Sequence, residues 1–129
     1  MWKTITYHGE EYYNYEVNEV GDIYNRWTGR TLRGSTSSTC LYPRVNLYGK
    51  KVLVHRIVAE AFVPLQKPSK SISDEEWEIT PASVKQLIMK TMCVNHIDHD
   101  KENFHYENLE WVTQEENAQK RDEFYSRAA

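Results

Sequence analysis

Three short segments in the last third of the chain carry side chains that can do chemistry together. They are Val94–Asp98, which contains Asn95 and His96, then Asn108–Thr113, and the asparagine at position 117. Hydrolysis of a phosphodiester needs a base that activates water and a cation that neutralises charge on the phosphate. An imidazole that titrates near neutral pH is a suitable base, and amide oxygens suit a hard cation. These residue types predict a small metal-dependent site for cleaving phosphodiester bonds.

Each of these residues has an expected role. We expect His96 to be the general base, and Asn95 and Asn117 to offer oxygens to Mg²⁺ or Mn²⁺. Water and the substrate phosphate would complete the shell of so sparse a site. Asn108 is expected to fix the intervening loop by hydrogen bonds to its backbone. Asparagine is also common in turns and caps, so a purely structural role for Asn108 stays open.

Two other kinds of metal site fit this region less well. The run from Asp98 begins like a calcium-binding loop, but its sixth residue is Asn103 instead of glycine and its twelfth is Leu109 instead of glutamate. His96, His99 and His105 together suggest zinc only weakly, since no cysteine accompanies them.

Short elements must position the reactive side chains. We expect strands at residues 92–95 and 108–112, a polar loop between them at 97–107, and a helix at 114–124. Thr113 and Glu116 have the spacing of a capping box, which fixes the start of the helix. Asn117 then falls on the first helical turn, close to the preceding strand.

Residues 12–62 are expected to form β-hairpins that end in a helix. Tyr13, Tyr15 and Val17 alternate with polar residues, and turns are predicted at Gly21-Asp22 and at Trp27–Gly29. A second hairpin is predicted to join residues 44–48 to 52–55 through Gly49-Lys50. A helical spacing begins at residue 56, and the proline at position 64 ends it.

The second hairpin has a polar face. Val45 and Leu47 are expected to face the core, which leaves Arg44, Asn46 and Tyr48 together on the opposite side. A two-stranded ribbon with such a face can enter a major groove of DNA and reach the base edges.

The charge distribution points to the same partner. The formal net charge is −3, yet no acidic residue lies between Asp22 and Glu60, whereas the chain from Asp98 onward is mainly acidic. A segment with only cations suits a phosphate backbone, and interleaved aromatic residues favour this interpretation over a simple solvated surface. The residues expected to contact DNA are Arg26, Arg30, Arg33, Arg44, Asn46, Lys50, Lys51 and Arg56.

Length and composition predict one compact unit in a reducing compartment. A chain of 129 residues can bury a single core, and it has no apolar run long enough for a membrane span or a signal peptide. Cys40 and Cys93 lie far apart without a C-x-x-C pair, which disfavours a zinc knuckle or a disulfide framework. We therefore expect a cytoplasmic protein with no evident protein partner.

Residues 65–91 are expected to be a linker or insertion with a helix. Ser73 and Glu76 form a second capping-box pattern, and Thr80 before a proline predicts another helix start. The apolar residues at 84, 87, 88 and 92 share one helical face, for which packing on the core is favoured over binding a partner.

The combined pattern resembles a known family. Residues 94–103 and 108–117, together with His55–Phe62, are similar to the HNH endonucleases of phages and group I introns. Residues 15–24 resemble the DNA-binding module often fused to that nuclease. The similarity covers nearly the whole chain except about residues 65–91. Departures include His99 where many relatives have glycine and Phe104 where a second asparagine is common.

The resemblance implies an α+β fold with N-terminal antiparallel hairpins, a helix and then a ββα-metal nuclease motif. It divides the chain into a DNA-binding region (1–64), an insertion (65–91) and the nuclease motif (92–129). In the family, the residue matching His96 activates water, those matching Asn95 and Asn117 bind a divalent metal, and the one matching Asn108 orients the loop. The implied function is a metal-dependent endonuclease acting on double-stranded DNA in the host cell of a phage or bacterium. The alternative is a DNA-binding protein that has kept the fold and lost cleavage.

Overall fold

The fold combines short antiparallel strands with helices, as an α+β arrangement. The computed structural model describes residues 1–38 and 40–128, with side chains as far as residue 121. The strands are β1 (Lys3–Tyr7), β2 (Glu10–Val17), β3 (Ile23–Asn25), β4 (Arg30–Leu32), β5 (Arg44–Leu47), β6 (Lys50–Leu53), β7 (Cys93–His96) and β8 (Leu109–Val112). The helices are α1 (Val54–Phe62), α2 (Asp74–Ile79), α3 (Ala82–Thr91) and α4 (Gln114–Ala128), with a single 3₁₀ turn at Tyr106–Asn108.

Strands β1 to β4 form one antiparallel sheet in chain order, and its first strand was not expected from the sequence. A bulge shifts the register between β1 and β2, because Thr4 pairs with Glu16 whereas Ile5 pairs with Tyr12. The bulge changes which side chains of β2 face inward, so Tyr12 and Tyr15 are both buried and Tyr13 is exposed. The simple alternation expected for Tyr13 is therefore wrong, whereas the turns at residues 21–22 and 27–29 are confirmed.

Strands β5 and β6 pair as the second hairpin. Tyr48 and Gly49 form its turn, both with positive φ, one residue earlier than expected. Val45 and Leu47 are buried and Asn46 is exposed, which confirms the predicted two-faced ribbon.

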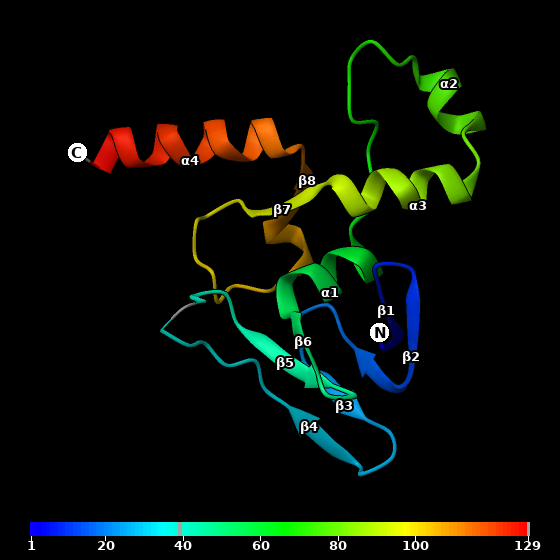
Figure 1. Ribbon diagram of the computed structural model, residues 1–129, viewed down its shortest axis with the longest axis vertical. Helices are drawn as coiled ribbons and strands as arrows, with labels where there is room; N and C mark the ends of the chain where they lie inside the picture. Colours follow the sequence, from blue (N-terminus) through cyan, green and yellow to red (C-terminus); the bar gives the residue numbers. More distant parts are fainter. Residues whose placement is uncertain (39, 129) are drawn as a thin grey trace.

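Helix α1 lies in the middle of the molecule, between the hairpins and the β7–β8 pair (Figure 1). It begins at Val54, two residues before the expected start, and ends at Phe62 before the predicted proline stop. All of its first six residues are buried, including His55 and Arg56. The buried first turns of the helix therefore include two polar side chains, those of His55 and Arg56.

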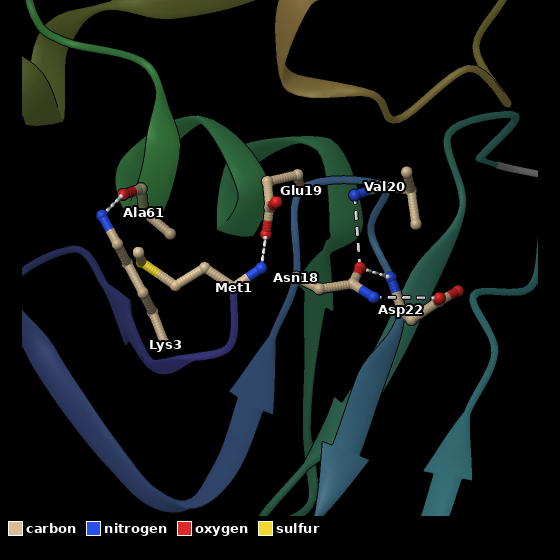
Figure 2. Close-up of polar contacts among 7 residues, drawn as sticks. All are labelled: Met1, Lys3, Asn18, Glu19, Val20, Asp22 and Ala61. Atoms are coloured by element: carbon tan, nitrogen blue, oxygen red, sulfur yellow. Dashed lines mark hydrogen bonds and ion pairs between the residues drawn. The ribbon is translucent and has the colours of Figure 1, made fainter.

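Figure 2 shows how the N-terminus is tied to this central helix. The Met1 amino group forms an ion pair with Glu19, and the ammonium of Lys3 donates to the carbonyl of Ala61 in α1 at 2.9 Å. Asn18 closes the β2–β3 turn by accepting from the backbone N–H of Asp22 at 2.9 Å. The Lys3 contact joins the four-stranded sheet to α1, whereas the other two stabilise the sheet and its turn.

In the segment between α1 and β7, α2 projects away from the hairpins, whereas α3 lies near the β1–β2 turn (Figure 1). Ser73 and Glu76 form the expected capping box of α2. The expected cap at Thr80 is wrong, since its hydroxyl instead donates to the carbonyl of Glu76 at the end of α2. The predicted packing of the apolar face of α3 on the core holds only at the end of that face: Met92, directly after α3, is buried and Ile88 is half-buried, whereas Val84 and Leu87 are exposed. None of the described helices is long and apolar enough to cross a membrane.

Candidate active site

The β7–β8 hairpin and the start of α4 position the predicted reactive residues. Asn95 pairs with Glu110 and His96 with Leu109 across the two strands, each within one residue of the expected boundaries. Alternation along β7 buries Val94 and His96 and leaves Asn95 half-buried. The capping box of Thr113 and Glu116 forms as predicted and starts α4 beside β8, which places Asn117 on its first turn.

Three of the four predicted site residues meet in one cleft. Asn95, His96 and Asn117 all line a cavity of about 380 Å³. The other walls come from the loop before β5, from the loop after β7 and from α4, through Cys40, Leu41, Tyr42, His99, Lys101 and Arg121. Among the side chains that the structure describes, two cations and no carboxylate line the cleft, which suits a negatively charged substrate.

Asn108, the fourth predicted residue, fixes the loop after His96. Its amide nitrogen donates to the Asp98 carboxylate at 2.9 Å and to the Asn103 carbonyl at 3.1 Å. Its amide oxygen accepts from the backbone N–H of Asp98 at 3.1 Å. With three hydrogen bonds across the loop, Asn108 positions the segment that follows His96, although it does not line the cleft.

His96 lies in a partly closed environment that favours its neutral form. The residue is 4% exposed, and burial lowers the pKa of its imidazole, while Asp98 acts in the opposite direction. The rings of His55 and Tyr42 lie beside it, at centroid separations of 4.9 and 5.9 Å. The Nε2 atom is buried and has no hydrogen-bond partner in the described structure, so Nδ1 is the nitrogen available to the cleft.

Asn95 is oriented by its cross-strand neighbour. Its amide nitrogen donates to the Glu110 carboxylate at 2.8 Å, and the Lys120 ammonium lies 3.3 Å from the same oxygen. Because the nitrogen is held by Glu110, the Asn95 amide oxygen is left for another partner. The side chain of Asn117 forms no hydrogen bond with any other described residue and remains available in the same cleft.

These donors fit a divalent cation that is held weakly by the protein alone. Within the described residues, no group of three His, Cys, Asp or Glu side chains is placed to hold a metal ion. The amide oxygens of Asn95 and Asn117 are hard, neutral ligands, which suit magnesium or manganese better than zinc.

The cations expected to contact DNA fall into two groups. Arg30, Arg33, Lys50 and Lys51 are exposed on the two hairpins, and Arg44 is half-buried. Arg26 is committed within the sheet, because it donates to Glu16 at 2.8 Å and to the backbone of Tyr13 at 2.8 Å.

A second hollow of about 160 Å³ lies on the β5–β6 hairpin. Its walls carry hydroxyls and two cations and no carboxylate, through Ser35, Thr36, Ser37, Arg44, Val45, Asn46 and Lys51. The guanidinium of Arg44 donates through Nη2 to the Ser37 hydroxyl at 3.3 Å, and its Nε atom is buried without a partner in the described structure.

The expected phosphate contact at Arg56 is wrong. Its guanidinium is 8% exposed and donates to the carbonyls of Met89 and Met92 at 2.7 Å each. It also lies 3.4 Å from the buried Glu60 carboxylate and over the Trp111 ring. A guanidinium that is shielded from solvent and whose two Nη atoms both donate to carbonyls is not available to a DNA backbone.

Sequence reasoning did not identify several residues of the cleft. Tyr42 and Arg121 come from segments far from β7 in the chain, and no local spacing marked them. His55 was not predicted to belong to the site either; it does not line the cleft but is buried beside Arg56 at the start of α1, and a buried polar side chain needs an explanation.

Comparisons with known proteins agree with this geometry. An uncharacterized HNH endonuclease of Acanthamoeba polyphaga mimivirus is 32% identical over 92% of this chain, which spans about a quarter of that protein. A solved structure describing DNA binding and cleavage by the HNH homing endonuclease I-HmuI has a TM-score of 0.66 and 28% identity, covering 99% of this chain and 59% of that one. Residues 52–119, more than half of the chain, match the sequence family described as HNH endonuclease. The chain thus belongs to the HNH endonuclease family.

Proposed function

We propose that this protein is a metal-dependent DNA endonuclease that uses His96 as its single general base. The observation that carries the proposal is the meeting of Asn95, His96 and Asn117 in one cleft. The solved relative is described as binding and cleaving DNA, which supports DNA as the substrate.

In the proposed reaction, His96 takes a proton from a water molecule. The water oxygen bonds to phosphorus, one ester bond between phosphorus and oxygen breaks, and the leaving oxygen takes up a proton from solvent. Burial favours the neutral imidazole that this step requires. Asn108 supports the step by fixing the backbone after His96.

Asn95 and Asn117 would hold a Mg²⁺ or Mn²⁺ ion in this site. When bound, that ion supplies positive charge to the phosphate and to the leaving oxygen. Lys101 and Arg121 line the same cleft and add fixed positive charge for an approaching phosphate.

The hairpins would bind the DNA. Arg30, Arg33, Lys50 and Lys51 are exposed, and the hollow between Arg44 and Lys51 fits an anionic group. The hydroxyls of Ser35 and Thr36 and the exposed ammonium of Lys51 are donors that a backbone phosphate can use. Asn46, exposed on the same ribbon, is placed to reach base edges.

A plasmid assay tests the proposal. Supercoiled DNA is incubated with the protein, with and without magnesium or manganese, and nicked and linear products are resolved. We expect cleavage only with the cation. The cleavage rate of the variant His96→Ala should be lower by about 10²-fold or more, the scale of losing a general base, while its DNA affinity is retained. Cleavage at an unchanged rate by that variant would overturn the mechanism.

The alternative function is a catalytically inactive DNA-binding protein with the same fold. The specific observation in its favour is that both proposed metal ligands are neutral amides. DNA binding without cleavage in either metal, across a range of concentrations, would establish this alternative.

A further inference from the structure

Two imidazoles from distant parts of the chain lie side by side behind the cleft. His55 is the second residue of α1, and His96 is the last residue of β7. Their ring centroids are 4.9 Å apart and the planes are tilted by 51°. The Tyr42 ring completes the cluster, with its centroid 5.1 Å from that of His55. The centroid of the Tyr42 ring also lies 5.9 Å from that of His96, so all three rings are neighbours.

Each histidine has one buried ring nitrogen without a partner in the described structure. The atoms are Nδ1 of His55 and Nε2 of His96. A buried polar atom left without a hydrogen bond costs about 1 to 3 kcal/mol, so buried polar groups nearly always have partners. Two such atoms on adjacent rings can satisfy each other after a small rotation, or can share one water molecule.

The direction of such a hydrogen bond decides whether His96 can act as a base. A neutral imidazole carries its proton on one nitrogen, and the partner of that nitrogen selects the tautomer. If Nε2 of His96 donates inward, its Nδ1 has no proton and can accept one from water in the cleft. If Nε2 instead accepts, Nδ1 carries the proton and His96 cannot act as the base.

We propose that His55 is a positioning residue whose Nδ1 accepts a hydrogen bond from the Nε2–H of His96, directly or through one buried water. This contact holds His96 in the tautomer whose Nδ1 can take a proton. The inference rests on the proposed role of His96 and adds a second histidine that does not touch the substrate. His55 is suited to accept because burial lowers its pKa to about 3, which keeps the ring neutral and leaves one nitrogen without a proton.

Nuclear magnetic resonance of ¹⁵N-labelled histidine in the metal-free protein tests the tautomer without any cleavage. We expect His96 of the unmodified protein to carry its proton on Nε2. In His55→Leu, which fills similar space without an acceptor, this preference should weaken or reverse. In His55→Gln, whose amide oxygen can accept, it should be retained. A proton on Nδ1 of His96 in the unmodified protein would overturn the proposal even if His55→Leu does not fold.

Single-turnover cleavage provides the second readout. We expect His55→Leu to cleave about 10-fold or more slowly with unchanged DNA affinity, and His55→Gln to recover most of the rate. Val58→Ala is the matched control, because Val58 is fully buried in the same helix and does not line the cleft. Equal rates for the leucine and glutamine variants, or a loss in Val58→Ala as large as in His55→Leu, would refute the positioning role. Absence of cleavage by the unmodified protein would refute the proposed function and leave the tautomer result to decide this inference.

Discussion

At the scale of single residues, Asn95 shows why the proposed metal site has so little charge. Its amide nitrogen donates to Glu110, which is directly opposite on β8. A carboxylate at position 95 could not make this hydrogen bond and would face Glu110 as a like charge. The neutral amide therefore keeps the β7–β8 pair stable, and the proposed consequence is weak binding of cations in the absence of DNA.

The substitution Asn95→Asp tests whether the neutral amide stabilises the β7–β8 pair at the cost of weaker cation binding. We expect it to strengthen Mn²⁺ binding to the DNA-free protein, because the added carboxylate attracts the cation. We also expect a lower melting temperature without metal, because two carboxylates then face each other. Calorimetric titration with Mn²⁺ and thermal unfolding with and without the ion measure both effects. Asn117→Ala is the comparison, and should raise the metal concentration needed for cleavage. If Asn95→Asp binds Mn²⁺ no better than the original protein, the ligand is elsewhere.

His55 predicts a specific dependence of stability on pH. Burial lowers its pKa from 6.5 to about 3 in the folded state. As pH falls below 6.5, the unfolded chain therefore takes up this proton before the folded one does. The free energy of unfolding should decrease by up to about 1.4 kcal/mol per pH unit between pH 6.5 and 3, with no such loss above pH 6.5.

Denaturant unfolding of the original protein and of His55→Gln, compared at each pH, isolates this contribution. The difference in unfolding free energy between the two proteins should shrink as the pH falls through that window. Parallel curves from pH 7 to pH 4 would show that His55 is not kept neutral by its surroundings.

At the scale of elements, α1 connects the two halves of the molecule. Arg56 links it to the end of α3 and the start of β7 through two carbonyls, and Glu60 accepts from the backbone of His8 at 3.0 Å. Arg56 and Glu60 are thus an internal ion pair with hydrogen bonds on both sides. Such a pair fixes the position of neighbouring elements, because losing one partner leaves the other as an uncompensated buried charge.

We expect Arg56→Met to lower the free energy of unfolding by about 3 kcal/mol, because Glu60 then remains buried without its cation. Burial already raises the pKa of the Glu60 carboxyl, which shows how poorly the site solvates a lone anion. Adding Glu60→Gln to Arg56→Met should recover part of the loss. Arg30→Met, at an exposed position, should change stability by about 0.5 kcal/mol or less. Similar small effects at both arginines in denaturant unfolding would contradict this account.

The elements also show which structural features could be predicted from local sequence patterns. The capping boxes at Ser73 and Thr113 could be predicted because hydrogen bonds between near neighbours determine them, and the strands of the β7–β8 pair could be predicted from their local residue pattern. The bulge opposite Tyr13 could not, since it depends on how β1 is paired with β2.

The same limit applies to the site. Asn95, His96 and Asn117 could be brought together from short-range spacing alone. Tyr42 and His55 reach His96 only through the packing of α1 and of the loop before β5. Arg56 was misassigned because a basic residue in a cationic segment looks the same in the sequence whether it is exposed or buried.

At the scale of the whole molecule, charge is divided between two ends. The hairpins carry the cation-only segment, and α2 with its acidic first turn lies at the opposite end (Figure 1). The negative net charge therefore does not oppose DNA binding, because a local positive surface determines the approach of a polyanion. With Arg56 buried and Arg26 committed within the sheet, five cations remain for the proposed contact: Arg30, Arg33, Arg44, Lys50 and Lys51.

These five cations predict how DNA affinity depends on salt. Each phosphate neutralised contributes a slope of about −0.9 to a plot of log affinity against log salt concentration, so the slope should be about −4 to −5 if all five engage. Arg44→Gln should weaken binding to all sequences and reduce the slope by about 0.9. Lys70→Gln, exposed in the loop before α2, should leave both values unchanged. Fluorescence anisotropy with a labelled duplex at several salt concentrations, without divalent metal, measures the slopes. Equal losses from the two substitutions would mean that DNA does not approach through the hairpins.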